Sequence, residues 1–442
     1  MNGTRINAEK NFSIFLISEN PLNQRDRGPR RVYFHTPGCL AFHFLSLLTL
    51  RTLWHLYFMS VISFPAGCHK ENLMSEYVFW IPFDLLERFM GDVFIAVGVP
   101  PEDAKTCAEV LITADKRGID SHGISRMKTI YYDRIRSGIQ KPVTVFEVIR
   151  EGPSTAVIDG HDGMGQVISA RAMAMAIDKA RRCGLGMTAV RNSTHYGIAG
   201  YYAMMAAGSG MVGITGTNAR PSVAPTLGVE NLLGTNPLVF ALPTDEEFPF
   251  VIDCATSLTQ RGKIEVYARL GKPLPDGWVV DRNGKSVTDP IVALDGLIKG
   301  ICALAPLGGI GEDTAGYKGY GYSTLVEILS AALQGGAYLT MLTGMEDGRK
   351  VPYKLGHFFM AIDITAFTGV DEFKRISGNI LRQLRASKKA PGARRIYTAG
   401  EKEYLAWLER KDKGAPVDPG LQKEMVFMRN ECNLKQYRFP WE

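Results

Sequence analysis

The sequence has few cysteines, and they are not arranged in a way that indicates a cross-linked or metal-bound structure. Seven occur in 442 residues, and no two have the Cys-x-x-Cys spacing of a zinc knuckle or a redox motif. An odd, dispersed set argues against a disulfide framework and favours reduced thiols in a cytoplasmic protein. The sequence also shows no cluster of metal-ligating side chains, so we predict no metal site.

The sequence also lacks a strong excess of either positive or negative charge. It contains no repeats and no low-complexity segments. The net charge is only +6, and residues 1–73 carry twice as many basic as acidic side chains, so the rest of the chain is nearly neutral. Without a basic stripe, the sequence gives no reason to expect a nucleic-acid partner. A hydrophobic content of 45% and a charged content of 22% are typical of a globular protein, and the length suffices for two or three domains.

Residues 1–73 differ in character from everything that follows. A polar, arginine-rich start gives way at 40–65 to an apolar stretch interrupted by His43, Arg51 and His55. The stretch is long enough for a membrane span, but an arginine near its middle makes insertion costly, and no clear signal-peptide cleavage site follows. We interpret 1–73 as an extension outside the fold, which favours Met74 as the natural start. A membrane anchor is the alternative.

A histidine near the middle of the chain stands between a predicted strand and a predicted helix. The apolar run 186–190 predicts a buried strand, 201–207 predicts a helix, and His195 lies between them in an Asn-Ser-Thr-His-Tyr-Gly motif. Turns of this kind place functional side chains at the edge of a sheet, and imidazole is suited to proton transfer near neutral pH. The alternative is a loop histidine that is merely hydrogen-bonded.

A second histidine follows two predicted amphipathic helices, at 82–97 and 101–117. The run Asp-Ser-His-Gly-Ile-Ser-Arg at 120–126 predicts a helix towards residue 136, capped by its aspartate or serine. On such a helix His122 and Arg126 share one face, so the guanidinium can bind a substrate carboxylate while the imidazole reaches the neighbouring oxygen. A capping histidine beside a surface arginine remains the alternative.

Three later segments suggest nucleotide binding. Gly-His-Asp-Gly-Met-Gly at 160–165 follows a predicted strand, but Ile168 replaces the third glycine of the dinucleotide fingerprint, which argues against an ordinary Rossmann site. Gly-Thr-Asn turns at 216–218 and 234–236 could hold cofactor groups or serve only as turns. Glycines and aromatics around Lys318 precede an apolar helix and indicate close backbone approach with a cationic contact.

Together these segments resemble the type-2 malate/L-lactate dehydrogenase family, which also includes ureidoglycolate dehydrogenase, diketogulonate reductase, piperideine-carboxylate reductase and sulfolactate dehydrogenase. The motifs that carry the resemblance lie at 120–126, 192–197, 234–237, 252–257 and 317–321. The resemblance implies a homodimer with an α/β, non-Rossmann fold, in which helical N-terminal and C-terminal parts surround a central mixed-sheet cofactor lobe. We therefore divide the chain into the extension 1–73, a helical substrate part 74–152, an NAD(P)-binding lobe 153–309 and a C-terminal part 310–442 that packs on the N-terminal part.

The resemblance also implies roles for individual residues. His195 is similar to the family's general base, His122 to its second active-site histidine, and Arg126 to its carboxylate-binding arginine. Asp253, at the end of a predicted strand, is expected to orient a histidine, although it could equally cap the next helix. The substrate is also expected to meet Ser121 and Tyr131, since the aromatic expected at position 130 is replaced by Ile130. The expected cofactor contacts are Thr217, Asn218, Arg220, Asn236, Pro237, Pro275, Asp276 and Lys318.

The predicted function is hydride transfer between NAD or NADP and a 2-hydroxy acid such as malate or lactate. Neither cofactor is preferred, because no ribose-reading acid or arginine can be assigned. The alternatives are a ureidoglycolate dehydrogenase, an NADPH-dependent reductase of 2-oxo acids or cyclic imines, and a catalytically silent, membrane-attached binding protein that uses residues 40–65. We expect a small-molecule substrate and a cytoplasmic homodimer without nucleic-acid or membrane partners.

Overall fold

The computed structural model of the protein describes residues 78–442. The predicted extension 1–73 and the favoured start at Met74 lie outside the described residues. Within the described part, no helix combines the length and the apolar character that a membrane span requires.

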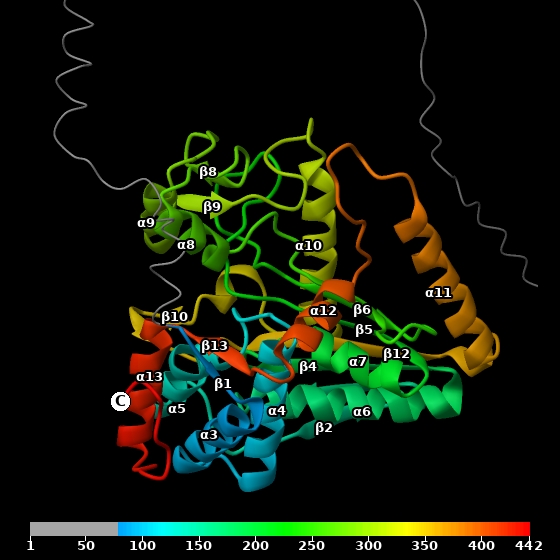
Figure 1. Ribbon diagram of the computed structural model, residues 1–442, viewed down its shortest axis with the longest axis horizontal. Coiled ribbons are helices and arrows are strands. Elements are labelled where there is room, and N and C mark those ends of the chain that lie inside the picture. The colour runs from blue at the N-terminus through cyan, green and yellow to red at the C-terminus, as the bar shows by residue number, and fades with distance from the viewer. Residues whose placement is uncertain (1–77) are drawn as a thin grey trace, which may run out of the picture. The chain divides into compact units, whose positions relative to one another are not determined.

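A mixed seven-stranded sheet lies at the centre of the described chain (Figure 1). Its strands, in spatial order, are β2 (Glu147–Glu151), β3 (Thr155–Asp159), β4 (Leu185–Ser193), β12 (Leu355–Asp363), β5 (Met211–Thr217), β6 (Leu238–Leu242) and β7 (Phe250–Cys254). Only β3 and β4 are parallel, and α6 (Gly165–Cys183) connects them; every other neighbouring pair is antiparallel. The predicted α/β fold without a doubly wound Rossmann sheet is therefore confirmed.

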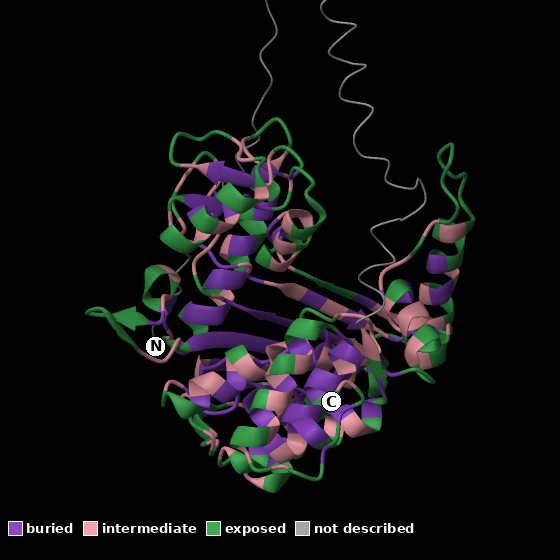
Figure 2. Cartoon of the chain, turned by 60° about the vertical axis from the view of Figure 1, so that its left-hand side comes forward, coloured by how far each residue is buried: buried purple, intermediate pink, exposed green. Residues whose placement is uncertain are grey.

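Helices cover both faces of this sheet. Figure 1 shows α6 and α7 (Gly200–Gly208) below it and α10 (Gly316–Ala331) above it. Glycines let the helix backbones come close, since a Cβ at Gly186 would lie 2.0 Å from the Ala176 carbonyl oxygen and one at Gly356 only 1.6 Å from that of Ser330. Several strands are consequently buried, as the purple segments of Figure 2 show.

The two ends of the described chain share a second core. The predicted helices are present as α3 (Phe83–Ala96) and α4 (Pro101–Lys116). Strand β1 (Phe79–Ile81) pairs with β13 (Ala415–Val417), and α13 (Pro419–Glu431) packs Met425 and Met428 into the same apolar cluster. The first helices are thus held by the last ones, beside the sheet's α6 face.

Two smaller groups of elements complete the described part. Helices α8 (Arg261–Leu270) and α9 (Pro290–Lys299) pack with the hairpin-like pair β8 (Val279–Asp281) and β9 (Cys302–Leu304) around a small core of their own. The strands β10 (Met345–Glu346) and β11 (Arg349–Lys350) form a short hairpin before β12.

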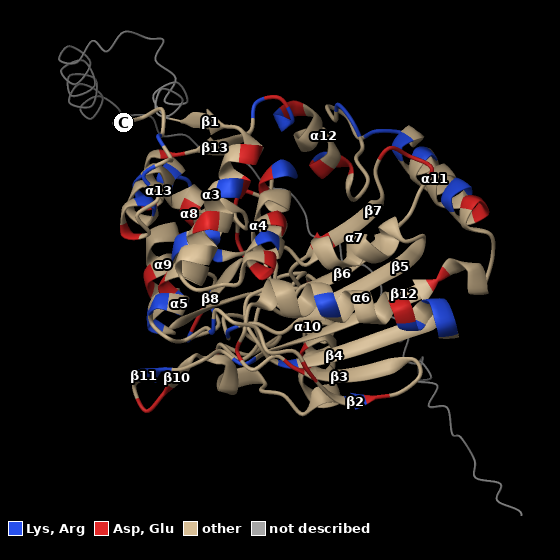
Figure 3. Ribbon diagram, turned by 90° about the horizontal axis from the view of Figure 1, so that it is seen from below, with Lys and Arg blue, Asp and Glu red and all other residues tan. Residues whose placement is uncertain are grey.

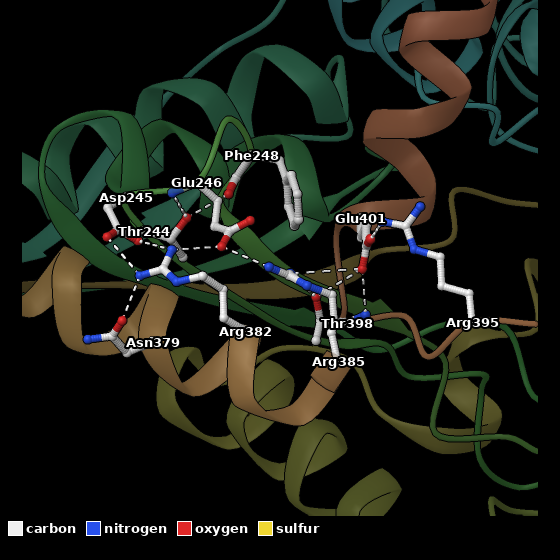
Figure 4. Close-up of polar contacts among 10 residues, drawn as sticks. All are labelled: Thr244, Asp245, Glu246, Phe248, Asn379, Arg382, Arg385, Arg395, Thr398 and Glu401. Atoms are coloured by element: carbon white, nitrogen blue, oxygen red, sulfur yellow. Dashed lines mark hydrogen bonds and ion pairs between the residues drawn. The ribbon is translucent and has the colours of Figure 1, made fainter. Parts of the chain in front are cut away.

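Ion pairs attach α11 (Val370–Ala386) and α12 (Glu401–Arg410) to the rest of the fold (Figure 4). Glu401 is only 2% exposed and accepts hydrogen bonds from Arg395 and from the backbone of Thr398. Arg385 lies 3.9 Å from Glu401 and 2.7 Å from Glu246, so it links α11 to the loop after β6 as well. Both signs of charge alternate over the outer helices in the view of Figure 3.

Candidate active site

His195 lies in the turn between β4 and α7, as the sequence predicts. The glycine-rich run at 160–165 packs against this turn and is hydrogen-bonded to it. The Thr194 hydroxyl donates to the carbonyl of Gly163 (2.7 Å) and accepts from the amide of Gly165 (3.0 Å). A Cβ at Gly165 would lie 2.4 Å from the Thr194 carbonyl oxygen, so only glycine allows this approach. These glycines therefore build the histidine turn, which explains why they depart from the dinucleotide fingerprint.

Both nitrogens of His195 can be assigned. The Tyr131 hydroxyl lies 2.6 Å from Nδ1, and the Gly197 amide donates more weakly to the same atom at 3.3 Å. Nε2 has no partner among the described residues. Desolvation, followed by the charges of His122, Arg134 and Arg126, holds the pKa of His195 well below its usual value of 6.5. The imidazole is therefore neutral at neutral pH, with one nitrogen available.

His122 stacks against this imidazole. The two ring centroids are 6.0 Å apart with an interplanar angle of 18°. Ser121 places its hydroxyl 2.8 Å from Nδ1 of His122. Burial and then the charge of Arg126 lower the pKa of His122 to about 4, so it too is neutral at neutral pH.

The segment that carries His122 is not the regular helix that we predicted. A turn at 120–123 is followed by the short 3₁₀ helix Ile124–Arg126, the π-helix Met127–Tyr132 and α5 (Asp133–Arg136). The Ile124 amide is capped at 2.9 Å by Asp115 from α4, and neither predicted cap, Asp120 nor Ser121, takes that part. The prediction was wrong because the cap comes from a distant, buried carboxylate. His122 accordingly precedes the helical run and shares no helix face with Arg126.

The π-helix determines where Tyr131 points. A π turn contains one more residue than an α turn, so it advances each following side chain around the axis. Ile130 occupies the position where an aromatic was expected, and the next residue, Tyr131, is fully buried with its hydroxyl on His195. The structure thus places Tyr131 behind the histidine, outside the cavity wall where a substrate contact was predicted.

Arg126 is free to bind an anion. Its Nε donates to the Ser121 carbonyl at 2.5 Å, whereas its two terminal amino groups have no partner among the described residues. Its charge reaches both active-site histidines, since it contributes to lowering the pKa of each. A planar guanidinium with two free amino groups is the side chain that binds carboxylates in a bidentate way.

A cavity of about 190 Å³ opens beside the two histidines. Its wall brings together seven of the residues that the sequence predicted, namely Ser121, His122, His195, Thr217, Asn218, Pro237 and Asp253. Small and apolar residues, including Ile198, Ala219, Ala255 and Leu355, make up much of the remaining wall. An apolar slot with a few polar groups is suitable for one ring of a cofactor next to a proton-transferring side chain.

Asp253 contacts no histidine. Its carboxylate accepts a hydrogen bond of 2.7 Å from the Gly200 amide at the start of α7. Desolvation raises its pKa although this bond and the charge of Arg117 act in the opposite direction. Asp253 therefore takes neither predicted part: it binds the first amide of the preceding helix α7, the next helix α8 begins after Gln260 without a side-chain cap, and the contact with a histidine is made by Tyr131.

The asparagines of the two Gly-Thr-Asn turns point into the protein. Asn218 bonds the Gly356 amide (2.8 Å) and the Ala337 carbonyl (3.0 Å), while Asn236 donates to the carboxylate of Glu327 at 2.8 Å. The Thr217 hydroxyl likewise lies 2.7 Å from Nδ1 of the buried His357. These side chains hold the loops against α10 and β12, which leaves the loop backbone to face the cavity.

Besides the buried Asn236, four residues predicted to bind the cofactor do not line this cavity. Arg220, Pro275, Asp276 and Lys318 are all exposed. Pro275 and Asp276 lie in the loop before β8, and the Lys318 ammonium lies 5.8 Å from the ring centroid of Tyr317 in the first turn of α10. Arg134 was not predicted from the sequence, although its charge contributes to lowering the pKa of His195. It lies three residues after Tyr131, and on a helix this spacing puts the two side chains on one face.

Comparisons with known proteins agree with this geometry. Residues 81–426 match the malate/L-lactate dehydrogenase family. The malate dehydrogenase of Pyrococcus abyssi is 46% identical over 372 residues, which cover 84% of this chain and 99% of that protein. The L-sulfolactate dehydrogenase of Methanocaldococcus jannaschii is 40% identical over 349 residues, covering 79% and 96%. The crystal structure of malate dehydrogenase from Entamoeba histolytica superimposes with a TM-score of 0.78 at 42% identity, covering 82% of this chain and 99% of that one.

The chain therefore belongs to the malate/L-lactate dehydrogenase family, as its motifs suggested, and is a hydroxy-acid dehydrogenase. Membership in this family implies a nicotinamide cofactor.

Proposed function

We propose that the protein interconverts malate and its 2-oxo acid with NAD or NADP as the cofactor. The observation that carries this proposal is that two neutral histidines line one cavity, and that the charge of a nearby arginine, Arg126, reaches both of them. The two terminal amino groups of Arg126 have no partner among the described residues. A 2-hydroxy acid needs a cation for its carboxylate and a base for its hydroxyl, and this site has both. The names of the malate dehydrogenases among the relatives support malate as the substrate.

A nicotinamide ring suits the apolar part of the cavity. Ile198, Pro237 and Ala255 would contact the ring, and the loop backbone at Thr217 and Asn218 would meet its polar substituents. When bound, the nicotinamide accepts hydride in oxidation and donates it in reduction. Loop residues outside the cavity, Arg220 among them, remain the proposed contacts for the rest of the cofactor.

His195 moves the proton. During oxidation Nε2 accepts the hydroxyl proton of the substrate, and the Nδ1–H group donates to the Tyr131 hydroxyl oxygen. This tautomer uses the 2.6 Å contact with Tyr131 and gives up the longer bond from the Gly197 amide, which needs an unprotonated Nδ1. During reduction the imidazolium returns the proton from Nε2 to the new alkoxide. Arg126 holds the carboxylate in both directions, and His122, stacked on His195, lies close enough to bind the reacting oxygen. Tyr131 acts on the histidine in this scheme, because its hydroxyl is already engaged there.

A homodimer is part of the proposal. Exposed apolar side chains, Leu325, Ile328, Leu333 and Tyr338, follow one another along α10 and the segment after it. Two of them, Ile328 and Tyr338, line an apolar cavity of about 420 Å³. A contiguous exposed apolar surface of this kind is typical of a subunit interface. Light scattering coupled to size-exclusion chromatography would give twice the chain mass if the proposal holds.

A cytoplasmic location also remains our proposal. The described cysteines are unpaired, as expected in a reducing compartment. Among the alternative functions, the ureidoglycolate dehydrogenase and the imine or oxo-acid reductase share this site and differ in substrate. A catalytically silent binding protein does not need an unpaired arginine beside two desolvated histidines.

The experiment is a spectrophotometric screen of the full chain with 2-hydroxy acids, 2-oxo acids and ureidoglycolate, each with both cofactors. We expect malate-dependent reduction of one cofactor and oxaloacetate-dependent oxidation of its reduced form. The His195→Asn variant, purified in the same way, controls for contaminating host dehydrogenase. If no substrate is turned over faster by the wild type than by this variant, the proposed function is refuted.

A further inference from the structure

An arginine near the active-site histidine has no anionic partner among the described residues. Arg134 lies on α5, three residues after Tyr131, and its guanidinium stacks 4.3 Å from the ring centroid of Tyr353. The side chain is half-buried, and its charge is close enough to His195 to lower the pKa of that imidazole. The ring that holds it belongs to Tyr353, two residues before Leu355 in the wall of the cavity.

The part of the chain that the structure describes supplies no anion for this guanidinium. Among the described residues no hydrogen-bond acceptor or carboxylate pairs with the Arg134 side chain. The acid next to it in sequence, Asp133, is bound by Lys128 at 3.0 Å. A half-buried cation without a counter-ion is unfavourable, and in a protein site it usually indicates that the counter-ion belongs to a ligand.

Three arginines bring positive charge to this region: Arg126 and Arg134 act on His195, and Arg220 acts on Arg134. Burial is the main cause that lowers the pKa of Arg134, and the neighbouring charge of Arg220 adds to it. Arg126 is also without an anionic partner. One monoanionic substrate would neutralise only one of these guanidinium groups, whereas a substrate with two acidic groups would neutralise two.

We propose that Arg134, stacked on Tyr353, binds a second acidic group of the substrate, while Arg126 binds the carboxylate next to the hydroxyl-bearing carbon. This inference rests on the proposed function and narrows it: the site prefers 2-hydroxy and 2-oxo acids that carry a carboxylate or sulfonate at the far end. Arg134 is then the residue that separates malate from lactate.

The test compares two substrates that differ in the terminal group, which is a carboxylate in one and a methyl group in the other. Reduction of oxaloacetate and of 2-oxobutyrate is measured for the wild type, Arg134→Met and Arg134→Lys. Methionine keeps the length and the contact with Tyr353 but removes the charge. Arg136→Met, an exposed arginine on the same helix, is the matched control. Thermal unfolding of each variant shows whether the fold is intact.

We expect the wild type to prefer oxaloacetate. Arg134→Met should lower kcat/KM for oxaloacetate about tenfold to a hundredfold, as for a lost charged hydrogen bond. Its kcat/KM for 2-oxobutyrate should be unchanged, Arg134→Lys should recover part of the loss, and Arg136→Met should behave as the wild type. A wild type without preference, an equal loss on both substrates, or a change confined to the KM of the cofactor would overturn the assignment of Arg134. Inactivity of the wild type on both substrates would instead refute the proposed function.

Discussion

The Tyr131 hydroxyl lies 2.6 Å from Nδ1 of His195, and a π-helical turn brings it there. An aspartate usually orients a catalytic histidine, but a buried phenol takes that place here. A phenol can either donate to or accept from imidazole, whereas a carboxylate can only accept. Acceptance from Nδ1–H leaves Nε2 unprotonated, which is the tautomer that can take a proton from a substrate hydroxyl.

Replacing Tyr131 by phenylalanine tests this orientation. Tyr131→Phe should lower kcat about tenfold to a hundredfold, the value of a hydrogen bond to a charged group, with little change in KM for malate. Because the phenol oxygen stabilises the protonated imidazole, its loss should also move the acid limb of the oxidation profile to lower pH. A shift to higher pH would mean that the phenol donates to Nδ1 instead.

The pH profile of the wild type follows from the depressed pKa of His195. A base works in its unprotonated form, and desolvation together with neighbouring charges keeps this pKa well below 6.5. The kcat/KM for malate oxidation should therefore fall only at acidic pH, and the midpoint of this fall should lie below pH 6.5. Above pH 6.5, kcat/KM should show no further rise that depends on a histidine. Reduction, which needs the imidazolium, should accelerate as the pH falls. An oxidation limb centred above neutrality would contradict the assigned environment.

Arg126→Lys tests the proposed carboxylate contact. An ammonium cannot reproduce the bidentate geometry, so we expect a loss of about 2–3 kcal/mol in transition-state stabilisation, read from kcat/KM for malate. Cofactor affinity, measured by fluorescence titration, should be nearly unchanged. Kinetic constants equal to those of the wild type would remove Arg126 from the substrate site.

The ion cluster in Figure 4 predicts a stability effect away from the site. Glu401→Gln keeps the volume of a side chain that is 2% exposed but weakens its bonds to Arg395 and Arg385. We expect the free energy of unfolding to fall by about 1.5–3 kcal/mol in urea titrations at constant protein concentration. The matched control is Glu372→Gln, which removes an exposed pair with Arg375 and should change stability by less than about 1 kcal/mol. Equal changes in the free energy of unfolding for the two variants would show that the cluster stabilises the fold no more than an exposed ion pair does.

Local patterns were enough to predict much of the sheet and the histidine turn. Strands β3, β4 and β7 and helices α3, α4 and α7 follow from apolar periodicity and turn residues. The central strand β12 was missed, although the apolar run at 358–362 is of the kind that indicates a buried strand. Its place between two strands from far earlier in the chain could not be read from local sequence.

The finer errors at the site have a similar origin. Nothing in the residue types at 127–132 announces a π turn, so the direction of Tyr131 could not be derived. The residues Asn218 and Asn236 are as suitable for holding loops as for holding a cofactor, and only the positions of α10 and β12 decide between the two. Composition likewise could not tell that Asp115 would cap the His122 segment from another helix.

The assignment of proton transfer to His195 is the central claim, and the pH dependence of malate oxidation by two matched variants tests it most directly. His195→Asn should lower kcat about a hundredfold to ten-thousandfold and abolish the acid limb of the profile. His122→Asn should retain that limb, even if its rate is reduced. A His195 variant that keeps the limb while the His122 variant loses it would contradict the account, and would make His122 the acid–base residue.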